Sequence, residues 1–159
     1  MKGGRGIAVM VVVMWLAACL QAVAPKLTVA GARPDFLLAA MVVLSLHSRR
    51  IGGAVLGFSA GFIDGALASA SLGYYTVSRT VAGFLTAWSR DLKFEQSPWL
   101  VFATTFLATA LALTIRVFLP PARSIYPFAT ATILTATYNG VLAMPLYALL
   151  NRLLAPVRL

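Results

Sequence analysis

The chain has 159 residues, of which 60% are hydrophobic and only 11% are charged. Soluble domains carry about 25% charged residues, so this composition excludes an ordinary soluble protein and indicates a single integral membrane domain, residues 1–159. The net charge of +9 comes from Lys and Arg residues that stand singly or in pairs between apolar segments. That spacing is typical of topology control and of contact with anionic membrane lipids, and it argues against a nucleic-acid-binding face.

The first apolar segment, Ile7–Ala24, has 18 residues without a charge and is just long enough to cross a bilayer. Two processing patterns overlap it. Ala22-Val23-Ala24 resembles a signal-peptide cleavage site, and Leu16-Ala17-Ala18-Cys19 resembles a lipoprotein processing box. We expect an uncleaved first span, because small residues are ordinary packing positions in membrane helices.

The second apolar segment, Phe36–Leu46, has only 11 residues and follows Arg33-Pro34-Asp35. Proline and an early aspartate both favour the start of a helix. Full crossing needs about 20 residues, so two interpretations stay open. Either the helix starts at intermediate depth, covered by protein or lining a cavity, or the outer side of the protein is thin.

The third segment begins at Ile51 and ends near Asp64 or continues to Leu72. Within it four glycines recur at four-residue spacing: Gly53, Gly57, Gly61 and Gly65. In an α-helix this spacing places them on one face, where small residues let two helix backbones approach closely. We expect this face to contact a helix of this chain or of a partner, and Gly53 and Gly65 to tolerate substitution better than the inner two.

Three more spans are predicted: Tyr74–Trp88, Trp99–Leu119 and Pro127–Leu150, the last kinked at Pro145. Asp64 and Arg79 lie almost symmetrically about Ser71-Leu72-Gly73, so two helices meeting there would bring them to similar depth. Ionisable residues inside spans are usually paired, which predicts an ion pair that Asp35 and Arg33 could join. This polar cluster is either an internal staple between spans or a site for a ligand, ion or proton.

Six spans place both termini on one side of the membrane. With the termini in the cytoplasm, eight basic residues lie inside (Lys2, Arg5, Arg49, Arg50, Arg90, Lys93, Arg152 and Arg158) and four outside (Lys26, Arg33, Arg116 and Arg123). Cytoplasmic loops carry the excess of Lys and Arg, so this orientation is the predicted one.

Enzymatic chemistry is not expected. Gly57–Gly61 reads G-x-S-x-G, but the serine-hydrolase motif needs a strand–turn–helix context. The single histidine, His47, would lie about 12 Å in depth from Ser59 at 1.5 Å per residue, which is too far for a nucleophile and its base. The carboxylates, histidine and cysteine show no metal-ligand spacing, and no metal or cofactor is expected.

Three motifs in order resemble the rod shape-determining protein MreD family. They are Pro34-Asp35-Phe36-Leu37-Leu38, then Gly57-Phe58-x-x-Gly61-Phe62-x-Asp64, then Leu72-Gly73 followed by a span. The resemblance implies an all-α inner-membrane protein that binds MreC, a bitopic periplasmic protein, in the peptidoglycan elongation machinery. That assembly also contains MreB, RodA and a class B penicillin-binding protein. We expect a non-enzymatic scaffold that holds the span of MreC against the glycine face.

The family is similar in architecture to the six-helix substrate-binding subunits of energy-coupling-factor vitamin transporters, which supplies an alternative function. Ala18-Cys19-Leu20-Gln21-Ala22 is an A-x-x-x-A pattern of the kind those subunits use to dock their partner. A vitamin site would need polar and aromatic residues that converge on an outer pocket. The candidates are Tyr74, Tyr75, Trp99, Tyr126, Tyr138 and Asn139.

Overall fold

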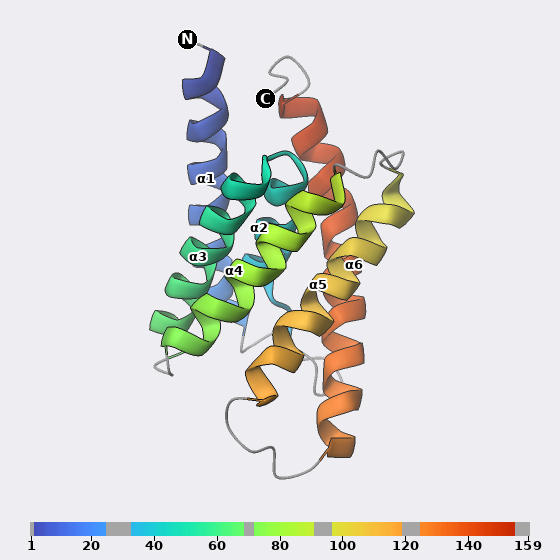
Figure 1. The fold of residues 1–159 in the computed structure, drawn as a ribbon. Helices are drawn as coiled ribbons and strands as arrows, with labels where there is room; N and C mark the ends of the chain where they lie inside the picture. Colours follow the sequence, from blue (N-terminus) through green and yellow to red (C-terminus); the bar gives the residue numbers. More distant parts are fainter. Residues whose placement is uncertain (1, 25–32, 69–71, 91–96, 119–124, 155–159) are drawn as a thin grey trace.

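Six helices and no strand make up the part of the chain that the computed structural model describes, residues 2–24, 33–68, 72–90, 97–118 and 125–154. The helices are α1 (Lys2–Val23), α2 (Phe36–Leu46), α3 (Arg50–Leu67), α4 (Leu72–Ser89), α5 (Pro98–Phe118) and α6 (Ile125–Leu154). They run alternately in opposite directions, so that α1 begins and α6 ends at the same end of the bundle (Figure 1). The predicted all-α class is confirmed.

Each predicted segment corresponds to one helix. The third segment ends at Leu67, between the two predicted ends, and Pro145 lies inside α6, which continues through it to Leu154. Within the described residues, three helices contain windows long and apolar enough to cross a membrane: Gly6–Val23, Pro98–Ile115 and Phe128–Leu153. The remaining helices are shorter, 11 residues in α2 and 18 each in α3 and α4.

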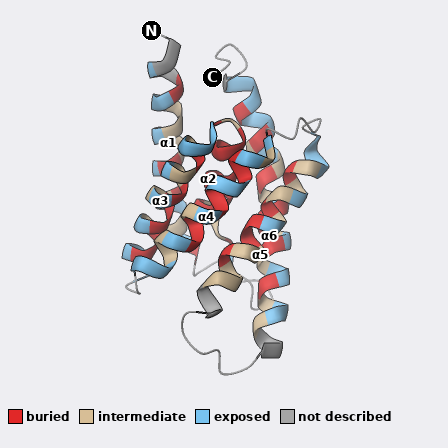
Figure 2. Ribbon diagram, viewed as in Figure 1, coloured by how far each residue is buried: buried red, intermediate tan, exposed pale blue. Residues whose placement is uncertain are grey.

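The centre of the bundle is α2. Every residue from Leu37 to Leu46 is buried, and α2 contacts each of the other five helices (Figure 2). A helix that is apolar all round is stable only inside a protein or a membrane, which explains its nearly continuous hydrophobic sequence. The other helices wrap this short core helix, so its two ends are where polar backbone groups must find partners within the bundle.

The helix α2 starts inside the bundle rather than at its edge. The backbone N–H of Asp35, the residue before α2, donates to the side chain of Asn139 at 2.9 Å. Asn139 lies near the middle of α6, a 30-residue helix about 45 Å long. Within the bundle, α2 therefore begins level with the middle of α6, which favours the interpretation of a helix that starts at intermediate depth.

The other end of α2 is closed by His47. Its Nδ1 lies 2.8 Å from the Val43 carbonyl oxygen, and its Nε2 lies 2.8 Å from Oδ1 of Asn151 on α6. The ring also lies against that of Tyr147, with centroids 5.3 Å apart. These contacts tie the C-terminal end of α2 to the last turns of α6, and α3 begins only three residues later.

Candidate functional site

Arg79 and two aspartates form a buried cluster between α2, α3 and α4. Arg79 is only 2% exposed, and its Nη2 donates to Oδ2 of Asp64 at 2.6 Å and to Oδ2 of Asp35 at 2.5 Å. The predicted Asp64–Arg79 ion pair is therefore present, and Asp35 joins it. Arg33, the fourth predicted member, forms no ion pair with a described residue; it is exposed at the rim of the adjoining cavity.

Asp35 performs two structural tasks at once. Its Oδ1 accepts a hydrogen bond from the Leu38 backbone N–H at 2.9 Å, which makes it the N-cap of α2, while its Oδ2 pairs with Arg79. An N-cap satisfies one of the four backbone donors that a helix leaves free at its start, and a negative charge there also suits the helix dipole. The carboxylate therefore starts α2 and connects it to α4.

Side chains from the remaining helices complete a polar network. Asn139 of α6 is fully buried; its Oδ1 accepts the Asp35 N–H, and its Nδ2 lies 3.4 Å from Oγ1 of Thr109 on α5. Gln21 of α1 accepts the backbone N–H of Leu37 at 3.3 Å. The N-cap residue of α2 and each of the other five helices thus contribute one side chain to the network around the start of α2: Gln21, Asp35, Asp64, Arg79, Thr109 and Asn139.

A polar cavity of about 480 Å³ adjoins the network near Ala24 and Leu67, where α1 and α3 end. Asp35, Asp64 and Gln21 line it together with Tyr75 and Thr135. Its volume exceeds that of several water molecules at about 30 Å³ each, and its polar lining suits water. The carboxylates therefore face this cavity on one side and Arg79 on the other. The Nη1 atom of Arg79 has no hydrogen-bond partner among the described residues.

The glycine face of α3 packs directly on α4. A Cβ atom added at Gly57 would lie 2.1 Å from the carbonyl oxygen of Arg79, and one added at Gly61 would lie 2.5 Å from that of Tyr75. Gly83 of α4 approaches α3 in the same way, because a Cβ atom added there would lie 2.3 Å from the Gly53 carbonyl oxygen. These approaches are possible only without side chains, so the glycines are the reason that the two backbones touch.

This packing corrects two expectations drawn from the sequence. The glycine face is filled by α4 of the same chain, so it is not the groove that receives a partner's span. Gly53, predicted to tolerate substitution, would place a Cβ 2.5 Å from both the Gly83 oxygen and the Ala87 Cβ. Gly65 is less crowded, because a Cβ atom added there would lie 3.1 Å from Leu72.

The sequence pattern of a known family covers nearly the whole chain. The family model described as rod shape-determining protein MreD matches residues 5–156. The chain belongs to the MreD family. This membership indicates a membrane protein with a role in rod shape determination and involvement in the shape-determining complex. Comparison with curated proteins and with solved structures found no match.

The residues of the three MreD-like motifs have different surroundings in the fold. Pro34 is buried immediately before the N-cap of α2, where a fixed backbone angle suits the approach to a helix. Leu72 begins α4 and contacts the Gly65 position. Gly73 is exposed, and a Cβ there would meet nothing within 4 Å. In this MreD chain Gly73 therefore makes no close packing contact, unlike Gly57 and Gly61.

The residues considered for catalysis are engaged separately. The hydroxyl of Ser59 donates to the Val55 carbonyl oxygen at 2.9 Å, within its own helix. The ring of His47 is held between Val43 and Asn151. Of the aromatic candidates for a vitamin pocket, Tyr75 lines the polar cavity, whereas Trp99 stands in the first turn of α5 and is not among its lining residues. The side chain of Tyr126 lies outside the described part of the chain.

Sequence reasoning left three members out of the predicted polar cluster, although Asn139 was named as a candidate for a vitamin site. Gln21 and Asn139 are isolated amides in otherwise apolar helices, and Thr109 is one of several threonines in α5. Amides inside membrane helices usually bond across to a neighbouring helix, so Gln21 and Asn139 carried a usable signal. Which groups they bond could not be read, because their partners are backbone N–H groups at the start of α2.

Proposed function

We propose that this MreD protein is a non-enzymatic scaffold of the bacterial inner membrane that binds MreC. By holding the single span of MreC it positions the periplasmic part of that partner for peptidoglycan synthesis. RodA, a class B penicillin-binding protein and MreB are then indirect partners in the same elongation machinery. The family membership supports a role in cell shape, and the arrangement of α3 supports a contact with another membrane helix.

The observation that carries this proposal is the outer face of α3, opposite its glycines. Four large apolar side chains on that face are each more than half exposed: Ile51, Val55, Phe58 and Phe62. They follow one another at spacings of four, three and four residues, which is the spacing of knobs in a helix–helix seam. We call these four residues the α3 ridge and propose that the MreC span packs on it.

The network around Arg79 supports a scaffold rather than an enzyme. Its described members bond to one another or to backbone N–H groups of α2, which connects all six helices. Among the residues that the structure describes, no group of three His, Cys, Asp or Glu residues could hold a metal. We therefore assign the network the role of an internal staple that fixes the shape of the outer faces.

Co-purification with MreC tests the proposal. The double variant Phe58→Ala, Phe62→Ala should keep normal membrane abundance, because both side chains are exposed, and should lose most of the bound MreC. Each membrane helix contact contributes about 1–2 kcal/mol, so two changes give an expected loss of tenfold or more. The control is Leu149→Ala, Leu153→Ala on the exposed face of α6, which should retain MreC. Normal MreC recovery with the α3 variant would refute the α3 ridge as its site.

The proposed orientation places both termini in the cytoplasm. It is supported by the described arginines Arg49, Arg50, Arg90 and Arg152, which lie at the end of the bundle where α1 begins and α6 ends. Reporter fusions after residue 5 and after Leu159 should both report the cytoplasm, and a fusion within residues 122–125 should report the periplasm. A periplasmic signal from the C-terminal fusion would contradict this orientation.

A second candidate function, vitamin binding for an energy-coupling-factor transporter, is favoured by one observation. The polar cavity of about 480 Å³ lies within the range of small-molecule pockets, about 300–1,000 Å³. Direct binding measurements with a panel of vitamins on the purified protein separate the two functions. Tight binding of a vitamin without affinity for MreC would favour the transporter subunit and replace the scaffold proposal.

A further inference from the structure

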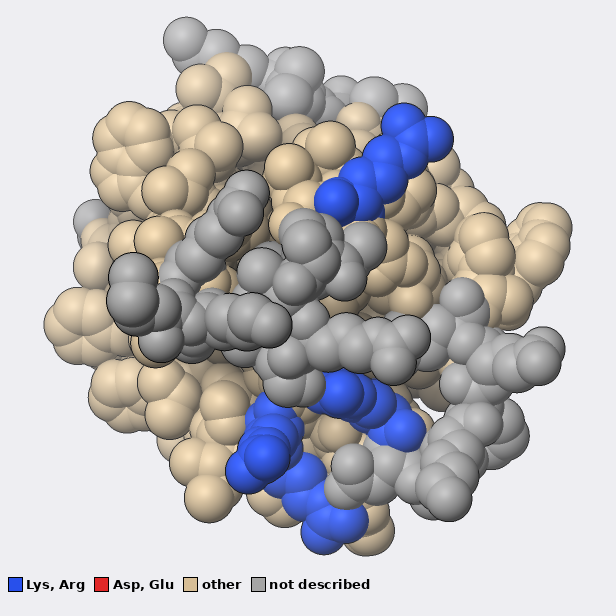
Figure 3. All heavy atoms as spheres, turned by 90° about the horizontal axis from the view of Figure 1, so that it is seen from above, with Lys and Arg blue, Asp and Glu red and all other residues tan. Residues whose placement is uncertain are grey.

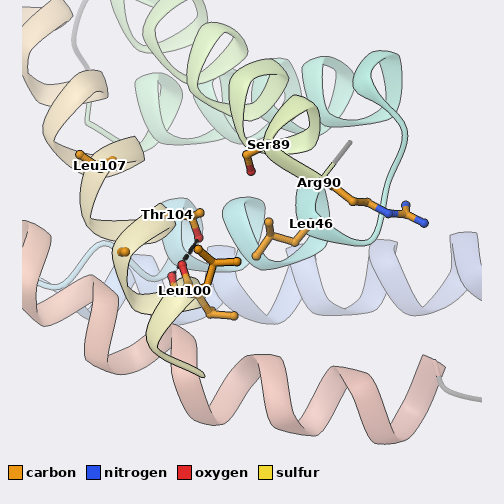
Figure 4. Close-up of a pocket in the computed structure, with 8 residues that line it drawn as sticks. Leu46, Ser89, Arg90, Leu100, Thr104 and Leu107 are labelled. Atoms are coloured by element: carbon orange, nitrogen blue, oxygen red, sulfur yellow. Dashed lines mark hydrogen bonds between the residues drawn. The ribbon is translucent and has the colours of Figure 1, made fainter. Parts of the chain in front are cut away.

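Two adjoining cavities form a groove along the contact between α4 and α5. Their volumes are about 230 Å³ and 200 Å³, and both are lined by Ser89, Thr104 and Leu107. The first also reaches Leu46 at the end of α2, and the second extends along α4 to Ala82. We call the two together the α4–α5 groove; Figure 4 shows the first of them with its lining side chains.

The hydroxyl groups along this groove are already satisfied. Thr104 donates to the Leu100 carbonyl oxygen at 2.9 Å, as the dashed line in Figure 4 marks, and Ser89 donates to that of Thr86 at 2.7 Å. Thr86 in turn donates to Ala82 at 2.7 Å. A polar solute would find few free donors along these walls, whereas a hydrocarbon chain leaves no polar group unsatisfied there. The groove is therefore suited to an apolar ligand.

A positive charge stands at one end of the groove. Arg90 directly follows α4 and is exposed, and its side chain extends away from the apolar lining residues Leu46 and Leu100 (Figure 4). Its Nη1 donates to the Ser48 carbonyl oxygen at 3.4 Å, and a guanidinium has five N–H donors in all. Arg90 shares this end of the molecule with Arg49, Arg50 and Arg152, and the described residues of this face include no Asp or Glu (Figure 3).

We propose that the α4–α5 groove binds one acyl chain of an anionic phospholipid, whose phosphate pairs with Arg90. The ligand must be apolar along the groove and negatively charged at the arginine end, and an anionic lipid of the adjacent leaflet has both properties.

Tryptophan fluorescence in vesicles tests the proposal, because brominated acyl chains quench a nearby indole. Trp99 precedes the lining residue Leu100 and is largely exposed, so the reporter is the variant Trp15→Phe, Trp88→Phe, which keeps only Trp99. It is reconstituted in phosphatidylcholine vesicles with a small fraction of brominated phosphatidylglycerol or, separately, brominated phosphatidylcholine. Phosphatidylglycerol should quench at about fivefold lower fraction, which corresponds to the about 1 kcal/mol expected for one arginine at a membrane surface.

Three matched variants locate the site. In the same background, Arg90→Gln should abolish the preference for phosphatidylglycerol, whereas Arg152→Gln should keep it, because Arg152 does not line the groove. Ala103→Phe fills the groove from an exposed position and should reduce quenching by both lipids. A chain that keeps only Trp15, on α1, should show no preference.

Several results would overturn the proposal. Equal quenching of Trp99 by the two lipids, or a preference that survives Arg90→Gln, removes the charge-directed site. A preference of the same size at Trp15 shows general enrichment of anionic lipid around the protein. If the two lipids quench Trp99 equally and added MreC removes that quenching, the groove binds a protein helix instead. The readout does not depend on MreC, so its failure leaves the scaffold proposal standing.

Discussion

Two neighbouring regions join α3 to α4 through different kinds of interaction. Along the glycine face the backbones touch, and the contact depends on the absence of side chains at Gly57 and Gly61. In the polar network the contact depends on charges that must be present, on Asp64 and Arg79. The first region therefore fails when atoms are added, and the second fails when a charge is removed.

The two regions meet at one residue. The carbonyl oxygen of Arg79 lies against Gly57, while its guanidinium binds Asp35 and Asp64. The close approach of the backbones is what brings the Arg79 side chain to the depth of the two aspartates. We infer that the glycines set the geometry of the ion cluster, so damage to the glycine face should also break the cluster, whereas the reverse effect should be smaller.

The largest effect is expected from Gly57→Leu. A Cβ there would lie 2.1 Å from a backbone oxygen, which no rotamer change relieves, so α3 and α4 must separate. Inserting even one extra methylene into a packed core costs about 1–3 kcal/mol, and leucine adds four carbons. Folded protein in the membrane should fall more than in any other variant described here. Gly73→Ala is the control, with open space around its Cβ, and its abundance should be normal.

Removal of the shared cation should give the next largest effect. Arg79→Gln leaves two carboxylates without their partner, and breaking a buried ion pair costs about 3–5 kcal/mol. Asp64→Asn should cost less, because Asp35 still pairs with Arg79. The measurement is the thermal unfolding midpoint in detergent. The exchange Asp64→Arg with Arg79→Asp should recover part of the loss, and no recovery would show that the two residues are not coupled.

A smaller effect separates the two tasks of Asp35. Asparagine keeps an N-cap acceptor and loses the charge, whereas alanine loses both, so Asp35→Ala should be about 1 kcal/mol less stable than Asp35→Asn. At Asp64, which caps no helix start, alanine and asparagine should differ little from each other. Equal stabilities of the two Asp35 variants would show that the bond to the Leu38 N–H does not contribute.

The smallest effect is expected from the neutral part of the network. Asn139→Ala leaves the Asp35 N–H without its acceptor, and polar contacts between membrane helices contribute about 1 kcal/mol. Its unfolding midpoint should fall by much less than that of Arg79→Gln. Thr137→Ala on the same helix is the control, since that side chain is exposed and bonds only to Ile133 of its own helix, and such changes stay within about 0.5 kcal/mol. A fall in the unfolding midpoint as large as that of Arg79→Gln would mean that Asn139 directly stabilises the ion cluster of Arg79 with the two aspartates.

Local sequence signals were sufficient for the helices themselves. All six helices could be placed from the apolar segments, from Pro34-Asp35 before α2 and from the break around Ser71-Leu72-Gly73. These signals suffice because a helix is stabilised by hydrogen bonds and side-chain periodicity within a few turns. The same signals predicted the pairing of Asp64 with Arg79. Two helices joined by a short connection must run side by side, so residues at equal distances from the connection reach the same depth.

What only the tertiary structure decided are the contacts between residues far apart in the chain. Asn139 is 104 positions from Asp35, and nothing local indicates that its amide accepts the N–H before α2. The occupant of the glycine face was equally open, since any smooth helix surface can meet a helix of the same chain or of another. Packing around the buried α2 explains the first contact, because a short helix that begins inside the bundle must take its polar partners from the helices around it. The glycine face is filled by α4, whose backbone lies directly against Gly57 and Gly61.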